Sequence, residues 1–164
     1  MRLLLLFALF TISSPWLWSQ TDTTAGNQPS ETPKSYVAPP DISGTWVGEL
    51  YQDAGGIADK FEFSMQIQQI GRGIKGTTYV KLGEIWAEMD FSGYLLPNGS
   101  WKILERGVVR SQKPVQLSWC MKRFILTLDY TATGLALNGP WYGDSEFGPC
   151  IPGSIRLRRK GKRV

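Results

Sequence analysis

The sequence predicts an all-β fold, an antiparallel up-and-down barrel of 8–9 strands. Apolar and polar residues alternate along several segments, and a period of two places them on opposite faces of a strand. Turn-forming residues separate these segments, among them Asn98-Gly99, a pair that suits a two-residue hairpin turn. Because closure removes the exposed edges of a long sheet, we expect the strands to form a barrel, with a β-sandwich as the alternative.

Residues 1–19 have the pattern of a secretory signal peptide. Met1-Arg2 gives a positive start, and Leu3 to Ile12 is an almost continuous apolar run. The run is too short to cross a hydrocarbon core of about 30 Å, but it suits the apolar core of a signal peptide. We therefore predict export to the periplasm or the extracellular space, with cleavage near Ser19 and Gln20. An uncleaved N-terminal anchor is the alternative.

Residues 20–40 follow as a predicted flexible linker. They are rich in Thr, Ser and Pro and show no apolar period, which is typical of a tether; a segment without a role is the alternative. The predicted barrel domain then covers residues 41–159, and residues 160–164 form a basic tail. The strands expected within the domain are 44–52, 60–70, 73–82, 85–96, 100–109, 114–121, 123–130, 134–142 and 153–159.

Alternation assigns the inner and outer faces of four of these strands. The rows expected to face the interior are Phe61/Phe63/Met65/Ile67, Ile74/Gly76/Thr78/Val80/Leu82, Ala87/Met89/Phe91/Gly93/Leu95 and Phe124/Leu126/Leu128/Tyr130. Glycines also recur within the strands, at Gly48, Gly76, Gly93, Gly107 and Gly139. Such glycines suit the bent strands and bulges of a small barrel.

The first predicted strand carries a family resemblance. It opens Ser43-Gly44-Thr45-Trp46-Val47-Gly48, and Gly-x-Trp at this position resembles the calycin barrels, lipocalins and avidins. The resemblance implies that Trp46 plugs one end of an up-and-down barrel. Gly76-Thr77-Thr78-Tyr79 looks slightly more avidin-like, but Gly48 and Glu49 stand where the biotin-contacting polar residues would follow. We therefore do not predict biotin binding.

The two cysteines are predicted to form a disulfide, since a pair in an exported chain is most simply bonded. Cys120 lies late in a predicted strand, and Cys150 lies in a loop that such a bond would fix. The segments Leu117–Lys122 and Gly148–Gly153 are also similar to small exported domains of unassigned activity from Gram-negative bacteria. The sequence has no histidine, and two thiols alone do not make a metal site, so we predict no metal and no cofactor.

Tryptophans provide the candidates for a binding site. Trp86, Trp101, Trp141 and Tyr142 are the residues that we expect to line a barrel mouth and stack on a small ligand. Ordinary core packing is the alternative for all of them. The acidic residues Glu84, Glu88 and Asp90 would suit a hydrolase, but they equally suit a polar outer face.

Basic residues concentrate at the C-terminus of a chain whose formal charge is +4. The basic residues of this segment are Arg156, Arg158, Arg159, Lys160, Lys162 and Arg163. Such a run can contact an anionic surface, or it can simply be solvated. Export argues against a nucleic-acid partner.

Taken together, these patterns favour an exported, non-enzymatic barrel that binds a small apolar or aromatic ligand. The alternative is a structural or interaction module of the cell envelope with a filled barrel. An eight-stranded barrel permits both, because its interior can be filled by side chains or can hold one small molecule.

Overall fold

The computed structural model describes residues 38–161; the predicted signal peptide and most of the predicted linker lie outside this range. The described residues form nine strands. These are β1 (Gly44–Gln52), β2 (Lys60–Ile70), β3 (Gly73–Leu82), β4 (Ile85–Leu95), β5 (Trp101–Gln112), β6 (Met121–Thr131), β7 (Gly134–Ser145), β8 (Gly148–Pro149) and β9 (Gly153–Arg159).

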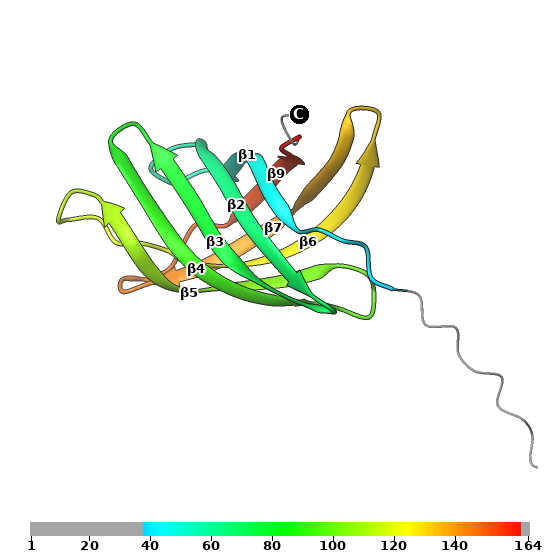
Figure 1. Cartoon of the computed structure of the whole chain (residues 1–164). Coiled ribbons are helices and arrows are strands. Elements are labelled where there is room, and N and C mark those ends of the chain that lie inside the picture. Colours follow the sequence, from blue (N-terminus) through cyan, green and yellow to red (C-terminus); the bar gives the residue numbers. More distant parts are fainter. Residues whose placement is uncertain (1–37, 162–164) are drawn as a thin grey trace, which may run out of the picture. The chain divides into compact units, whose positions relative to one another are not determined.

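The strands close into an antiparallel up-and-down barrel (Figure 1). From β1 to β7 each strand pairs with the next along the chain, and β9 pairs with both β7 and β1 to complete the ring. The short β8 pairs only with the end of β7 and lies outside the ring. The predicted fold class is confirmed, and the β-sandwich alternative is wrong.

One predicted strand is absent. The sequence predicts a strand at 114–121, but residues 113–120 form a turn and irregular backbone between β5 and β6. Pro114 cannot donate to a strand ladder, and its carbonyl accepts the amide of Leu117 at 3.2 Å. The alternating Leu117 and Trp119 cover one end of the barrel instead of joining the sheet.

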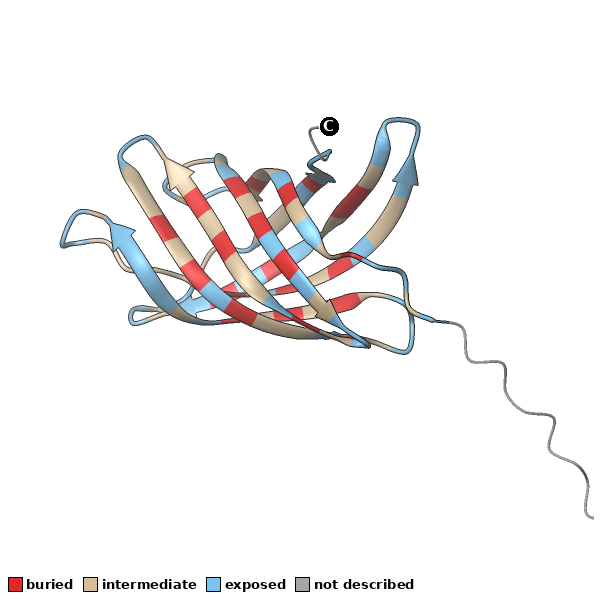
Figure 2. Cartoon of the chain, viewed as in Figure 1, coloured by how far each residue is buried: buried red, intermediate tan, exposed pale blue. Residues whose placement is uncertain are grey.

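The interior follows the predicted alternation. Buried residues recur along the strands of the ring between more exposed ones (Figure 2), and the inner rows of β2, β3 and β4 are those predicted. In β6, Phe124 and Leu126 are fully buried, whereas Tyr130 near the hairpin end is exposed. Burial of these apolar side chains away from water is the main force holding the ring together.

Trp46 fills the end of the barrel at which β1 begins. Its side chain is fully buried, and its indole Nε1 donates to the carbonyl of Ile42 at 2.8 Å. The guanidinium carbon of Arg159, on the neighbouring β9, lies 5.7 Å from the centre of the ring, a cation–π distance. A closed eight-stranded ring with this plug is consistent with the calycin resemblance at the level of architecture.

Inward-facing glycines allow the backbones of neighbouring strands to approach closely. A Cβ added at any of four predicted strand glycines would lie 2.4 Å or less from a carbonyl oxygen of the adjacent strand; these are Gly48, Gly76, Gly93 and Gly139. Real Cβ atoms essentially never come so close to another heavy atom. The fifth, Gly107, lies where the register between β4 and β5 shifts.

We expect Gly48→Ala to lower the free energy of unfolding by about 1–3 kcal/mol, the usual cost of overpacking. The new Cβ would lie 2.0 Å from the carbonyl oxygen of Arg156, so β1 and β9 must separate. Gly73→Ala is the control, since its Cβ would lie 3.5 Å from the nearest atom, the carbonyl oxygen of Ile70. Urea unfolding of both variants checks the prediction, and equal stabilities would contradict it.

Candidate functional site

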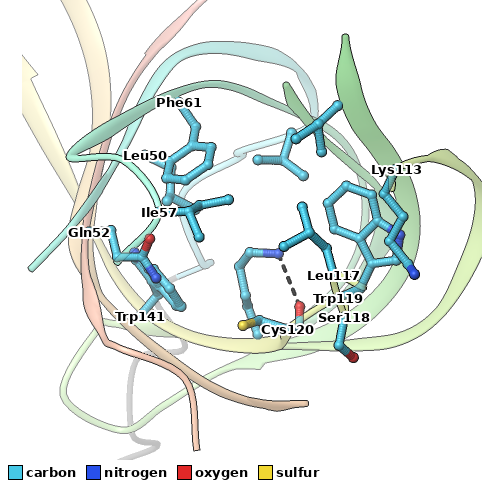
Figure 3. A pocket seen from close by; sticks show the side chains of 13 residues that line it. Leu50, Gln52, Ile57, Phe61, Lys113, Leu117, Ser118, Trp119, Cys120 and Trp141 are labelled. Atoms are coloured by element: carbon cyan, nitrogen blue, oxygen red, sulfur yellow. Dashed lines mark hydrogen bonds between the residues drawn. The ribbon is translucent and has the colours of Figure 1, made fainter. Parts of the chain in front are cut away.

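A cavity of about 140 Å³ lies at the end of the barrel opposite Trp46. Figure 3 shows the 13 side chains that line it. They come from the inner rows of the strands, from the β1–β2 loop and from the segment 113–120: Leu50, Gln52, Ile57, Phe61, Val80, Ile85, Lys113, Leu117, Ser118, Trp119, Cys120, Lys122 and Trp141. A cavity of roughly 150 Å³ holds benzene, whereas sites for drug-sized ligands start at about 300 Å³.

Strand direction explains why these residues meet. The ends of β1, β3, β5 and β7 lie at the same end of the barrel as the beginnings of β2, β4, β6 and β9, because all neighbours are antiparallel. Leu50 near the end of β1 therefore lies close to Phe61 near the beginning of β2. The apolar walls of the cavity continue the same inner rows that form the core.

A buried ion pair interrupts the apolar lining. Lys122 Nζ lies 3.3 Å from Glu105 Oε2, and the two side chains are 5% and 0% exposed. The carboxylate also accepts hydrogen bonds from Thr78 Oγ1 at 2.6 Å and from the backbone amide of Lys122 at 2.8 Å. A buried carboxylate is tolerated when it is paired and hydrogen-bonded in this way.

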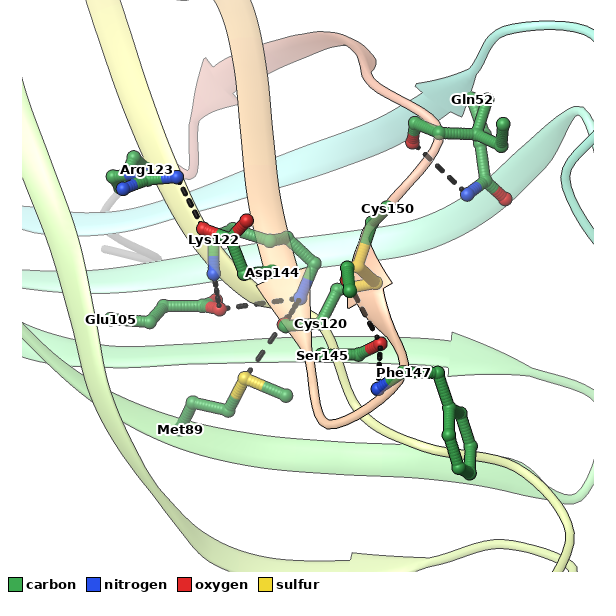
Figure 4. The surroundings of a disulfide bond; sticks show 12 residues. Gln52, Met89, Glu105, Cys120, Lys122, Arg123, Asp144, Ser145, Phe147 and Cys150 are labelled. Carbon is green, nitrogen blue, oxygen red and sulfur yellow. Dashed lines mark hydrogen bonds and ion pairs between the residues drawn. A yellow bond between two sulfur atoms is a disulfide. The ribbon is translucent and has the colours of Figure 1, made fainter.

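The ammonium of Lys122 also reaches the covering segment 113–120. It donates to the carbonyl of Cys120 at 3.1 Å and lies 3.8 Å from the sulfur of Met89 (Figures 3 and 4). Lys122 lines the cavity, whereas Glu105 lies behind it in the barrel interior. A molecule in the cavity therefore meets a cation before it meets the carboxylate.

This ion pair was not predicted from the sequence. Glu105 continues the inner row of Trp101 and Ile103, and Lys122 precedes Phe124 and Leu126 by the same step of two. Lys122 lies between two predicted strands, and alternation assigns no inner face to the predicted strand that contains Glu105. The signal was present, because opposite charges at inward positions of neighbouring strands predict a buried pair.

The predicted disulfide between Cys120 and Cys150 is confirmed in the structure (Figure 4). It joins the end of the covering segment 113–120 to the loop after β8, across a sequence separation of 30 residues. The amide of Cys150 also donates to the carbonyl of Gly143 at 2.9 Å, so this loop is fixed to β7. The covalent link thus holds one wall of the cavity against the ring.

The four predicted ligand-binding residues lie in different places. Trp141 lines the cavity, and its indole Nε1 donates to the carbonyl of Tyr51 at 2.8 Å. Trp101 begins β5 and is fully buried in the core, at the opposite end. Trp86 packs against Tyr79 on the outer face, with 6.1 Å between ring centres, and Tyr142 is 45% exposed. Neither Trp86, Trp101 nor Tyr142 is among the lining residues.

Trp119 lines the cavity, although it was not among the site residues predicted from the sequence. Its indole Nε1 is buried and has no hydrogen-bond partner among the described residues. The sequence predicts Trp119 on a strand at 114–121. That strand does not form, so the predicted position of Trp119 differs from the observed one. The indole Nε1 of Trp101, in the filled core, is likewise buried without a partner among the described residues, so the unpaired donor of Trp119 does not by itself indicate a ligand.

The acidic residues considered for hydrolysis lie away from the cavity. Glu88 Oε2 accepts a hydrogen bond from Arg110 Nε at 2.6 Å, in an ion pair between β4 and β5. Asp90 is the next outward residue of β4 and is exposed. Neither Glu88, Asp90 nor Glu84 lines the cavity.

The described part of the basic C-terminal segment belongs largely to β9. Arg156, Arg158 and Arg159 are strand residues, and Lys160 follows them directly; Lys162 and Arg163 lie outside the described range. Arg156 and Arg158 lie in an outer groove over β1, β7 and β9. This segment therefore closes the barrel in addition to carrying charge.

Beside Arg156 lies a polar cluster on β1 and β2. The guanidinium carbon of Arg156 lies 5.3 Å from the centre of the Tyr51 ring, and the hydroxyl of Tyr51 donates to Glu49 Oε2. This hydrogen bond, followed by that from Lys60, lowers the pKa of Glu49 below its usual value. Its counterpart is a raised pKa for Tyr51, again caused mainly by the hydrogen bond to Glu49. Glu49 thus pairs with Lys60 of β2, while Arg156 of β9 contacts the face of the Tyr51 ring.

No protein-family model and no curated protein matches the chain. Within residues 38–161 there is no helix of the length and apolarity needed to span a bilayer.

Proposed function

We propose that the chain is an exported, non-enzymatic barrel that binds a small apolar or aromatic molecule in the cavity described above. The observation that carries the proposal is the position of the cavity: it lies at one end of a closed ring, with Trp119 and Trp141 in its walls and apolar side chains around most of its surface. Concave apolar sites with a few polar groups are typical of small-molecule binding.

The proposal of export rests on two features. Residues 1–19 have the pattern of a signal peptide, and disulfides such as Cys120–Cys150 persist mainly in oxidising compartments. The cavity has room for a group of roughly the dimensions of one aromatic ring.

Val80→Phe is expected to weaken the binding of small aromatic probes at least tenfold, because the added ring would occupy the cavity that Val80 lines. Toluene, indole and phenol are suitable probes, with the fluorescence of the chain's tryptophans as the signal. Val47→Phe is the matched control, since Val47 lies on the outer face of the same barrel and is 41% exposed. Circular dichroism of both variants verifies that the barrel has formed.

The alternative function is a structural or interaction module of the envelope with a filled barrel, with contact to an anionic surface through the basic residues of β9. It is favoured by the filled interior, in which Trp46 and Trp101 are fully buried and the remaining cavity is small. Failure of every small probe to bind the native chain would select this alternative.

A further inference from the structure

Both ionisable side chains that line the cavity are cationic. Lys122 is a buried lining residue, and Lys113, from the segment that follows β5, lines the cavity as well (Figure 3 labels Lys113). No aspartate or glutamate is among the lining residues. Lys113 takes part in none of the ion pairs formed within residues 38–161. Glu105 pairs with Lys122 and not with Lys113. The cavity therefore carries one more positive charge than its surroundings neutralise.

The hydrogen-bonding groups around the cavity are mainly donors. An ammonium has three N–H donors, and the oxygen partners of Lys122 are the carbonyl of Cys120 and the carboxylate of Glu105. Its remaining neighbour is the sulfur of Met89, a weak acceptor. The buried indole N–H groups of Trp119 and Trp101 both lack a partner among the described residues, but only Trp119 lines the cavity. A negatively charged acceptor would be a stronger partner for Lys122 than the sulfur of Met89.

The acceptor at the opposite side of the cavity is already surrounded by protein. Gln52 Oε1 is buried without a partner among the described residues, but a Cβ built on Gly56 would lie 2.2 Å from it, so the oxygen faces the β1–β2 loop. The amide nitrogen of Gln52 donates to the carbonyl of Ile151 at 3.2 Å. Gln52 thus contributes to the wall without offsetting the excess of donors toward the ligand.

We infer that the cavity selects a small monocarboxylate with a compact aromatic or branched apolar body, an inference that rests on the proposed function. The apolar body packs against Leu50, Phe61 and Trp141, and the carboxylate faces Lys122 and Lys113. Charge-assisted hydrogen bonds are roughly twice as strong as neutral ones, and they strengthen where water is excluded. The charge of the ligand is therefore the property that the cavity distinguishes.

The test compares benzoate with benzamide, which has nearly the same shape but no charge. Titration of the full chain, followed by tryptophan fluorescence and calorimetry, is expected to give roughly ten- to a hundredfold tighter binding of benzoate. Lys113→Met and the double variant Glu105→Gln/Lys122→Met are each expected to reduce this preference, and Lys113→Glu to reduce it further. Lys60→Met is the matched control, because it removes a lysine of the outer face.

The outcomes distinguish failure of the inference about ligand charge from failure of the proposed ligand-binding function. Benzamide or toluene binding as tightly as benzoate would overturn the inference about charge and leave the proposed ligand site standing. A preference for benzoate that survives both Lys113→Met and the double variant would also overturn it. If none of benzoate, benzamide, toluene and indole binds the native chain, the proposed function itself fails.

Discussion

Lys122→Met is expected to lower the free energy of unfolding by about 3–5 kcal/mol, because it leaves the buried carboxylate of Glu105 without its counter-ion. The Glu105 side chain is 0% exposed, and Lys122 Nζ at 3.3 Å is its only cationic partner among the described residues. The bonds from Thr78 Oγ1 and from the backbone amide of residue 122 remain, but they do not neutralise the charge. Most domains are stable by about 5–15 kcal/mol, so the loss is a large part of the total.

The double variant Glu105→Gln/Lys122→Met is expected to recover most of this stability, since no unpaired charge is left. The side-chain amide that replaces the carboxylate can accept from the backbone N–H of residue 122 and donate to Thr78 Oγ1, whereas the carbonyl of Cys120 loses the ammonium as a donor. Lys60→Met is the control for removing an exposed lysine. It breaks the ion pair with Glu49, in which both side chains are about half exposed and screened by water, and is expected to change stability far less than Lys122→Met.

Urea unfolding measured by tryptophan fluorescence distinguishes these cases. Similar losses for Lys122→Met and Lys60→Met would mean that water reaches Glu105 and that the pair is not a buried one. A double variant as unstable as Lys122→Met would show that the lysine stabilises the barrel by packing, through its aliphatic stem against the inner row, and not by charge.

The fold was predictable because alternation is a direct consequence of strand geometry. The inner rows of β2, β3 and β4 required only the period of two, and closure followed from the need to avoid free edges. The segment 113–120 was not predictable in this way. Leu117 and Trp119 alternate as in a strand, but whether such residues join a sheet or cover its end depends on partners far away in the sequence.

The candidate site was predictable only in part. The row containing Glu88 and Asp90 already placed Trp86 on the outer face, and antiparallel order places Trp101 and Trp141 at opposite ends of the barrel, since one begins β5 and the other lies late in β7. Only Trp141 was therefore in a position to meet Cys120 and its neighbours. Glu105 and Lys122 were not predicted as inner residues, because a charged residue interrupts the apolar alternation of an inner row. The interruption is tolerated here because the two opposite charges lie on neighbouring strands and pair with each other.

Loss of the disulfide is expected to lower the free energy of unfolding by about 3–4 kcal/mol, according to the chain-entropy relation for a loop closed across 30 residues. The double variant Cys120→Ser/Cys150→Ser and reduction of the native chain should give the same loss. The bond connects two segments of weak local structure, the covering segment 113–120 and the loop after β8. The loop is also hydrogen-bonded to β7, whereas the covering segment makes no strand ladder, so the covering segment is the part whose ordering depends most on the disulfide.

Loss of the disulfide is expected to loosen the cavity wall formed by residues 113–120 more than the strands of the ring. Cys120 lines the cavity, and its carbonyl accepts a hydrogen bond from the ammonium of Lys122. Release of Cys120 therefore loosens a cavity wall and removes a hydrogen-bond partner of Lys122. Amide hydrogen exchange should therefore rise first in residues 113–120, while β1 to β3, which pair along their whole lengths, stay protected. Reductant added to the double serine variant is the control and should change nothing. If instead the native chain keeps its stability and its slow exchange in 113–120 with both thiols free, the disulfide does not hold the cavity wall, and packing of Leu117 and Trp119 alone retains it.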